Sequence, residues 1–370
     1  MPDSLKTNAL TVLVAPLDWG LGHTTRCIPI IRELMNKKCV VLVAGNGIQE
    51  RIIREEFPQI DFLPLEGYNI RYGRSAFWTR LRLLLQIPKI TRIIRQEHDW
   101  LQEQVRQHPI DVIISDNRYG LYHKKIPSVL LTHQLRVRTP LGRWGDWFAR
   151  FVNYRWIRNF GACWVPDFEP DKGLAGLLSH PEKETPFAKT YVGPISRMSK
   201  NPAVLPKDSK LLILLSGPEP QRSLFENKLI DQLATSHFQA TVVRGLPATA
   251  SQIPSTNHLR FFNHLAAEDL SKEMQEAEWV ISRCGYSTIM DLASLQKKSI
   301  LVPTPGQAEQ EYLAGYLQEK GMALCIPQRT FDLAAAIALA GSGNWRWPEG
   351  SYDGAPLRQA IDELLTRAKD

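Results

Sequence analysis

The sequence predicts two doubly wound α/β domains in tandem, and three observations support this fold class. The chain has 370 residues, which is enough for two domains of ordinary size. Short β-branched apolar runs alternate with helical patterns, as in parallel sheets built from βαβ units. The alternation stops at a polar, proline-containing stretch and then starts again. We therefore predict an N-terminal domain over 1–193, a linker over 194–207 and a C-terminal domain over 208–370, whose last helix could cross back to the first domain.

The first half begins with a strand that leads through a turn into a helix. Residues 10–15 are six apolar or β-branched residues that end at Pro16, which predicts a buried strand. After a turn with two glycines, apolar side chains recur at helical spacing over 24–37. The other elements predicted here are strands at 40–44, 60–63, 110–115 and 128–132 and a short helix at 47–56.

The second half repeats this alternation after the linker. A strand at 211–215 is followed by a turn at 216–222 and a helix at 224–234, and the tail at 355–368 is amphipathic. Ligands of doubly wound folds bind beyond the carboxyl ends of the strands, so two such domains should enclose a cleft. The remaining predicted elements are strands at 240–243, 259–262, 279–282 and 299–303 and helices at 266–276, 286–294 and 309–319.

The composition is that of a globular chain. Hydrophobic residues make up 44% and charged residues 22%, which excludes the low hydrophobicity and high net charge of disordered chains. No apolar run approaches the ~20 residues that a membrane-spanning helix needs, and the N-terminus lacks the pattern of a signal peptide. The five cysteines form no Cys-x-x-Cys pair, so neither a disulfide framework nor a zinc site is expected. These features predict a protein of the reducing cytoplasm.

Positive charge is concentrated in the first half of the chain. Residues 1–200 hold 29 basic and 19 acidic side chains, whereas residues 201–370 hold 16 and 19. The segments 71–95 and 136–160 combine arginines with aromatic residues. Such a segment can be a solvated basic face with its aromatic side chains turned inward, or it can lie on an anionic membrane surface such as the inner face of the membrane. Nucleic acid is disfavoured as a partner because no recognisable binding scaffold accompanies these segments.

The turn after the first strand contains the first candidate site. Gly20 and Gly22 would let a ligand approach the backbone, and the following helix would point its N-terminal amides at that ligand. His23 stands at the helix start, where the dipole favours a neutral imidazole that can act as a general base. The same residues would also suit an ordinary strand-to-helix turn. Because Thr25 replaces the third glycine of Gly-x-Gly-x-x-Gly, a dinucleotide site is disfavoured.

A carboxylate follows the strand at 110–115. The residue just past the carboxyl end of a parallel strand faces the cleft, so Asp116 could reach His23. There it would orient the imidazole and stabilise the imidazolium that forms during proton transfer. The alternative is a simple turn, since Ser-Asp-Asn is turn chemistry in any case.

Two strand-to-helix junctions in the second half suit an anion. At the first, Ser216 and Gly217 offer a hydroxyl, bare backbone and exposed amides. At the second, Ser287 and Thr288 offer hydroxyls and amides to a diphosphate, with Arg283 as a fixed charge nearby. The alternative at the second junction is a capped helix start that binds nothing.

Acidic and amide side chains continue this pattern. Asp291 lies one helical turn after Ser287, and its carboxylate could accept hydrogen bonds from ribose hydroxyls. After the strand at 299–303 comes a proline-containing loop and a helix that opens with acidic and amide residues. Gln307, Glu309 and Gln310 could bind sugar hydroxyls there, although acidic residues are also favourable in any first helical turn.

In order and spacing, the segments 20–26, 282–291 and 303–311 resemble the GT-B glycosyltransferases. The chain is most similar to the glycosyltransferase family 28 group, in which Arg-x-Gly-x-x-Thr-x-x-acid, a proline loop and a Gln-containing helix start follow in this order. The resemblance implies two Rossmann-like domains that face each other across a cleft. The first loop is shorter than the family's glycine run, Ser-Gly-Pro-Glu replaces a Gly-Gly-Ser-type loop, and the acceptor half shows little specific similarity.

The resemblance also implies a role for individual residues. Arg283, Gly285 and Thr288 would contact the nucleotide diphosphate, as would the loop at 216–217. Asp291 would hold the ribose, Glu309 and Gln310 would bind the donor sugar, and His23 matches the histidine of the family's first glycine loop.

On this basis we expect an inverting glycosyltransferase without a metal or other cofactor. Its nucleotide-sugar donor, a UDP-sugar, would transfer to a hydroxyl acceptor such as a cell-envelope glycan or a lipid-linked precursor. Helix N-termini and Arg283 would stabilise the leaving diphosphate, and no Asp-x-Asp metal motif occurs in the sequence. The rival interpretations are a nucleotide-sugar hydrolase of the pseudaminic-acid type, which shares Gly-x-Gly-His-x-x-Arg-Cys, an epimerase, and a non-catalytic basic binding module.

Overall fold

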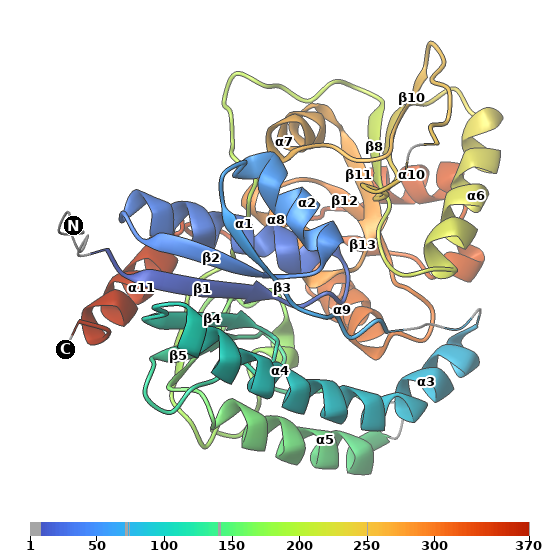
Figure 1. Ribbon diagram of the computed structural model, residues 1–370. Coiled ribbons are helices and arrows are strands. Elements are labelled where there is room, and N and C mark those ends of the chain that lie inside the picture. The colour runs from blue at the N-terminus through green and yellow to red at the C-terminus, as the bar shows by residue number, and fades with distance from the viewer. Residues whose placement is uncertain (1–8, 71–72, 74, 140–141, 250, 370) are drawn as a thin grey trace.

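The structure is a computed structural model that describes residues 9–70, 73, 75–139, 142–249 and 251–369. Two parallel sheets with helices on both faces confirm the predicted fold class (Figure 1). Between Tyr191 and Lys210, where the linker is predicted, the chain forms neither helix nor strand.

The first sheet has the strand order β3-β2-β1-β4-β5-β6-β7, and all its neighbouring strands are parallel. Its strands are β1 (Thr11–Pro16), β2 (Val40–Gly45), β3 (Asp61–Pro64), β4 (Val112–Asp116), β5 (Ser128–Leu131), β6 (Ala162–Val165) and β7 (Lys189–Tyr191). The helices along this part of the chain are α1 (Leu21–Asn36), α2 (Gly47–Glu56), α3 (Ala76–Leu85), α4 (Ile87–Gln107) and α5 (Gly142–Ile157), with a 3-10 turn η1 (Gly176–Leu178).

The second sheet repeats this winding in the order β10-β9-β8-β11-β12-β13, again with parallel neighbours. Its strands are β8 (Lys210–Leu214), β9 (Gln239–Val243), β10 (Leu259–Phe262), β11 (Trp279–Arg283), β12 (Ser299–Val302) and β13 (Leu324–Cys325). The helices are α6 (Gln221–Ala234), α7 (Ala267–Glu276), α8 (Tyr286–Ser294), α9 (Ala308–Glu319), α10 (Leu333–Ser342) and α11 (Ala355–Arg367), with a 3-10 turn η2 (Gln328–Thr330).

Each sheet is buried between two helical layers because its strands are apolar on both faces. In the first sheet, Val12 and Val14 face α1, whereas Leu13 and Ala15 lie on the side of α4. In the second sheet, α7, α8 and α9 cover one face and α6 and α10 cover the other. The strands therefore read as continuous hydrophobic runs, as expected for buried parallel sheets.

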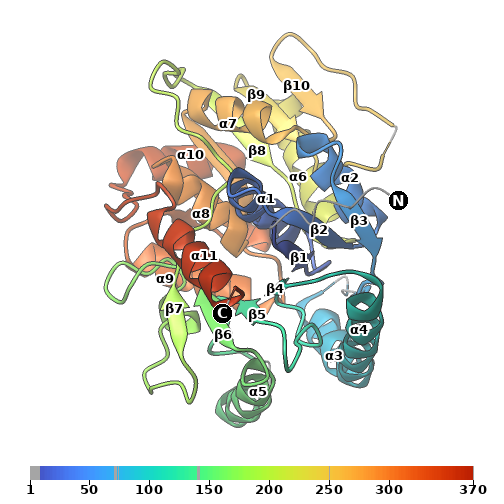
Figure 2. The same ribbon diagram turned by 60° about the vertical axis from the view of Figure 1, so that its left-hand side comes forward.

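The last helix packs on the first sheet rather than on the second. Leu357, Ile361 and Leu364 of α11 share a hydrophobic core with Val12 and Ile28. Figure 2 shows α11 beside α1 and the first-sheet strands. We therefore define the N-terminal lobe as β1–β7 with α1–α5 and α11, and the C-terminal lobe as β8–β13 with α6–α10.

The strand orders place a switch point in each sheet. The chain winds one way from β1 and the other way from β4, and it does the same from β8 and β11. Ligands of such sheets bind where the winding direction reverses, beyond the carboxyl ends of the strands. Direct contact between α1 and α8 brings the two switch points together.

Candidate active site

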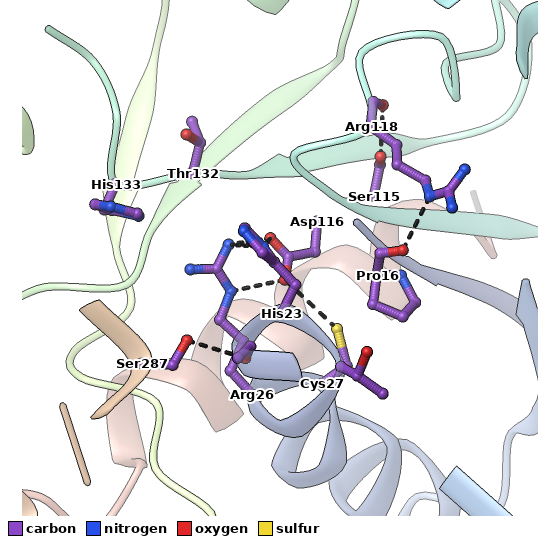
Figure 3. A network of polar contacts seen from close by, with 12 residues as sticks. Pro16, His23, Arg26, Cys27, Ser115, Asp116, Arg118, Thr132, His133 and Ser287 are labelled. Atoms are coloured by element: carbon purple, nitrogen blue, oxygen red, sulfur yellow. Dashed lines mark hydrogen bonds and ion pairs between the residues drawn. The ribbon is translucent and has the colours of Figure 1, made fainter. Parts of the chain in front are cut away.

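Three side chains meet at the switch point of the first sheet. His23 and Arg26 lie in α1, and Asp116 is the last residue of β4 (Figure 3). The His23 Nδ1 atom is 3.1 Å from Asp116 Oδ1. Arg26 donates from Nε to Asp116 Oδ2 at 2.6 Å and from Nη2 to Asp116 Oδ1. One carboxylate at the buried end of β4 is thus shared between an imidazole and a guanidinium from the first turns of α1.

Burial and charge set the protonation of this group. Burial lowers the pKa of His23, the Arg26 and His133 charges lower it further, and Asp116 opposes them. Burial alone would raise the pKa of Asp116, but Arg26 and His23 outweigh it and hold that pKa at about 2. At neutral pH the site therefore contains a neutral imidazole and an ionised carboxylate, the protonation states that a general base and its orienting acid need.

The position of the proton on His23 depends on Asp116 and Arg26 together. Arg26 Nη2 lies 2.9 Å from His23 Nδ1 and can only donate, so it favours a lone pair on Nδ1. Asp116 Oδ1 can only accept, so it favours a proton on Nδ1. The tautomer that donates from Nδ1 to Asp116 leaves the Nε2 lone pair for a substrate proton.

The first glycine loop lies against the C-terminal lobe. Gly20 precedes α1 with φ 94°, a conformation that side chains rarely adopt. Gly22 allows a close approach, since a Cβ on it would lie 2.8 Å from Ser287 Oγ. The Ser287 hydroxyl donates to the Gly22 carbonyl oxygen at 2.9 Å. Ser287, predicted to bind a diphosphate, thus joins the two lobes at the start of α8.

The other predicted phosphate residues surround the switch point of the second sheet. Ser216 and Gly217 follow β8, and Gly217 has φ +99°. Gly285 precedes α8, and Thr288 lies half-buried in its first turn. The amide groups at the start of α8 and the loop at 216–217 together form the kind of site that accepts an anion.

Arg283 corrects one expectation. Its side chain is 1% exposed, and it donates from Nη2 to the Gln221 carbonyl oxygen at 2.7 Å. The guanidinium also lies over the Phe225 ring, 4.4 Å from its centroid, and burial lowers its pKa to about 9. Because β11 ends beneath the start of α6, Arg283 points inward and fixes that helix start. It is not exposed to a diphosphate in this structure.

Asp291 faces the connection between the lobes. Its Oδ1 accepts a hydrogen bond from Ser196 Oγ at 2.6 Å, and the residue is 8% exposed. Burial raises the pKa of Asp291 to about 6, against the opposing effects of Arg197 and Ser196. A ribose could contact Asp291 only by sharing the carboxylate that already binds Ser196 of the connecting chain.

The predicted sugar-binding residues divide at the start of α9. Gln307 caps this helix without a side-chain capping bond, and its Oε1 is buried with no partner among the described residues. Glu309 faces the N-terminal lobe, where His133 Nε2 lies 2.9 Å from its Oε1. Gln310 instead turns back to its own loop and accepts from the Thr304 amide at 2.9 Å. Gln310 is thus buried and bonded to its own loop, which differs from the predicted contact with a sugar.

Comparisons with known proteins relate the chain to glycosyltransferases. The model of the glycosyltransferase family 28 C-terminal domain matches residues 248–340. The chain is 21% identical over 329 residues to the UDP-N-acetylglucosamine--N-acetylmuramyl-(pentapeptide) pyrophosphoryl-undecaprenol N-acetylglucosamine transferase of Gloeothece citriformis, covering 86% of this chain and 83% of that protein. This chain is a family-28-like glycosyltransferase.

Solved structures show the same fold for the glycosyltransferase. MurG of Acinetobacter baumannii matches with a TM-score of 0.52 and 15% identity, covering 98% of this chain and 94% of that one. The Streptomyces glycosyltransferase SsfS6, complexed with thymidine diphosphate, matches with a TM-score of 0.57 and 15% identity, covering 96% of each chain. Both are GT-B neighbours, and the two-lobed architecture of the glycosyltransferase is therefore shared along its whole length.

Three site residues of the glycosyltransferase were missed by the sequence analysis. Arg26 lies one helical turn after His23, and this spacing could have indicated a second partner for Asp116. His133 and Gln134 come just after the strand predicted at 128–132, so the strand-end rule that selected Asp116 would have selected them too. Their contact with Glu309, which is distant in sequence, could be found only from the arrangement of the lobes.

Neither a metal cluster nor a bilayer-crossing helix occurs in the described part of the glycosyltransferase. No three or more His, Cys, Asp or Glu side chains in it converge as metal ligands would. Within the same residues, every helix is too short or too polar to cross a bilayer.

Proposed function

We propose that this glycosyltransferase is an inverting enzyme that transfers a sugar from a UDP-sugar to a hydroxyl group without a metal. The observation that carries the proposal is the His23–Asp116 contact at the switch point of one sheet, directly beside the α8 helix start of the other. A base on one side and an anion-binding helix start on the other are what a single displacement at a sugar carbon needs.

The proposed reaction assigns one task to each lobe. The donor lies on the C-terminal lobe, where the α8 amides, Thr288 and the loop at 216–217 bind the diphosphate as it leaves. Buried Arg283 holds the start of α6, which follows this loop, and contributes a fixed positive charge there. His23 takes the proton of the acceptor hydroxyl through Nε2, and Asp116 stabilises the imidazolium that results. Thymidine diphosphate in the SsfS6 complex supports a nucleoside-diphosphate donor.

A donor panel tests this proposal. We expect a UDP-sugar to raise the melting temperature of the full chain more than GDP- or dTDP-sugars do. A ligand at 100 times its dissociation constant adds about 2.7 kcal/mol of stability, which a thermal-shift assay resolves. A larger shift with dTDP- or GDP-sugars would contradict the UDP assignment. Rapid release of free sugar without an acceptor would favour the hydrolase over the transferase.

We further propose that the acceptor is lipid-linked and that the enzyme works at the inner face of the membrane. The Gloeothece relative is named for an undecaprenol-linked acceptor. Helices α3, α4 and α5 lie at one end of the molecule, away from α7 and β10 (Figures 1 and 2). Apolar side chains of these three helices are exposed. We call this set the aromatic edge: Phe77, Trp78, Leu85, Ile87, Trp144, Trp147, Phe148 and Phe151.

The charge near the aromatic edge fits an anionic bilayer. Lys89, Arg92 and Arg95 of α4 are exposed, as is Arg155 of α5. Exposed aromatic side chains beside basic ones are typical of surfaces that lie in the headgroup region. Residues 71–72, 74 and 140–141 of the two basic segments lie outside the described residues.

Removing aromatic side chains from this edge should release the protein from vesicles. Trp144 is 86% exposed and Trp147 is 56% exposed. Replacing each with serine should lower co-sedimentation with phosphatidylserine-containing vesicles by roughly 10-fold or more, because a buried large apolar side chain contributes about 1.5–3 kcal/mol. Binding should also weaken as salt is added.

Matched controls come from apolar residues exposed elsewhere. Leu205 in the connection and Leu339 in α10 are 73% and 55% exposed, and serine at either position should leave vesicle binding unchanged. Wild-type protein that stays in the supernatant at low salt would end the membrane proposal. Equal losses of vesicle binding after serine replaces Leu205 or Leu339 would also end the membrane proposal.

A further inference from the structure

A second imidazole–carboxylate pair joins the lobes beside His23. His133 follows β5 by two residues and is 2% exposed (Figure 3). Its Nε2 donates to Glu309 Oε1 at 2.9 Å, since a carboxylate can only accept. Gln134 donates from Nε2 to Glu309 Oε2 at 2.5 Å. Two consecutive N-terminal-lobe residues thus bind both oxygens of one carboxylate from the C-terminal lobe.

The His133 ring is also held by a second side chain of the opposite lobe. Tyr286 stacks on it with 4.1 Å between the ring centroids and 18° between the planes. The Tyr286 hydroxyl in turn donates to the Pro166 carbonyl oxygen at 2.7 Å. His133 is therefore enclosed by α8 and α9 side chains that can surround it only when the lobes are together.

Electrostatics link this pair to the proposed base. Burial would raise the pKa of Glu309, but His133, His23 and Arg26 lower it below its usual value. His133 also acts to lower the pKa of His23. The Nδ1 atom of His133 is buried and has no partner among the described residues.

Adhesion between the lobes does not require such a pair. The Tyr316 hydroxyl donates to the Gly173 carbonyl oxygen at 2.7 Å, and the Tyr312 hydroxyl accepts from the Leu177 amide at 2.7 Å. These neutral contacts already hold α9 against the N-terminal lobe. A buried carboxylate is a poor way to add stability, because its desolvation offsets the attraction of its partners.

We propose that His133 is a positioning residue that fixes Glu309 beside His23 when the lobes close. The donor site is then complete only in the closed form, because the two donors to the Glu309 carboxylate come from the opposite lobe. The inference rests on the proposed function and on the sequence-based expectation that Glu309 binds the donor sugar, and it adds a coupling between closure and alignment.

Kinetics on the full chain test the positioning role, with UDP-N-acetylglucosamine as the probe and UDP release as the readout. For His133→Leu we expect kcat to fall roughly 10–100-fold, the effect of losing a hydrogen bond to a charged group. KM should change by less than about three-fold, since closure follows binding. His133→Gln keeps an N–H donor at the position of Nε2 and should restore most of kcat.

His180 provides the matched control. It is another largely buried histidine of the N-terminal lobe, stacked on Tyr191 with 4.9 Å between centroids, and it bonds to the Phe168 carbonyl oxygen away from Glu309. His180→Leu should leave kcat unchanged in the folded protein. A loss of kcat in His180→Leu as large as in His133→Leu would show that general packing explains both losses, and it would overturn the positioning role.

A double-mutant cycle and a spectroscopic signature complete the test. His133→Leu and Glu309→Leu should be strongly non-additive in kcat, because each breaks the same pair, and additive effects would overturn the inference. In ¹⁵N NMR of histidine-labelled protein, His133 should be the neutral Nε2–H tautomer and should lose this preference in Glu309→Leu. An unchanged tautomer in Glu309→Leu would also overturn it. If wild type releases no UDP, the donor assignment fails, while the NMR signature still decides whether the pair exists.

Discussion

Replacing His23 with alanine should lower kcat by about 10²–10⁴, the range expected for the loss of a general base. The expectation follows from the neutral His23 imidazole and its 3.1 Å contact with ionised Asp116. Turnover would be followed as nucleotide release from the sugar donor that the thermal-shift panel selects. The same panel should show that donor affinity survives, since the proposed donor contacts lie on the other lobe.

A histidine outside the site separates catalysis from folding. His98 bonds to the Gly120 carbonyl oxygen and stacks on Tyr122, so His98→Ala should change stability without the large loss of kcat. Wild-type turnover in folded His23→Ala would remove the base from the mechanism.

The pH dependence has a definite sign. Because the pKa of His23 is lowered from 6.5, the imidazole is already a free base at neutral pH, and kcat/KM should fall only on the acidic side of 6.5. The unfolded chain binds more protons than the native one in that range, so the stability contribution of His23 is present above pH 6.5 and is lost as the pH falls. His23→Ala should remove this contribution to acid sensitivity.

The largest stability effect is expected from Arg26→Leu. Asp116 is fully buried, and Arg26 binds both of its oxygens. Without the guanidinium, an uncompensated carboxylate would remain in the core, which costs about 3–5 kcal/mol. Urea unfolding of the variant should show this loss as a lower midpoint with an unchanged slope.

An exposed ion pair on the same helix provides the comparison. Arg32 lies in α1 and bonds to Glu56 at 3.1 Å, with its side chain 49% exposed, so Arg32→Leu should cost no more than about 1 kcal/mol. Combining Arg26→Leu with Asp116→Asn should recover part of the loss, because the buried charge is then removed as well. Equal midpoints for the Arg26 and Arg32 variants would show that the buried pair is not what holds this site.

The sequence predicted the elements whose ends are marked by local signals. Helix α2 begins and ends where predicted, since Asn46 and Gln49 form a capping box at its start. Strands β7 and β13 have only three and two residues, too few for a periodic pattern, and they exist because a neighbouring strand pairs with them. Helix α3 and the first part of α4 lie in the segment 71–95, which was interpreted only as a basic face or a membrane-binding surface.

The same limit applies to the site. His23 and Asp116 could be paired from sequence because both follow strands that meet at one switch point. Glu309 was selected for its place after β12, but its contact with His133 depends on the closed arrangement of two separate lobes. The inward turn of Arg283 depends on its packing against Phe225 of α6. The spacing of a sequence motif does not reveal this contact.

Helix α11 has a consequence for the order of events during synthesis. Its residues Leu357, Ile361 and Leu364 complete the core beneath β1, although more than three hundred residues separate them from that strand. The nascent N-terminal lobe therefore lacks this helix until residues 355–367 have been synthesised, and the part of the apolar core that α11 covers stays open until then. Contacts of such long sequence separation slow folding and prolong exposure to chaperones or aggregation.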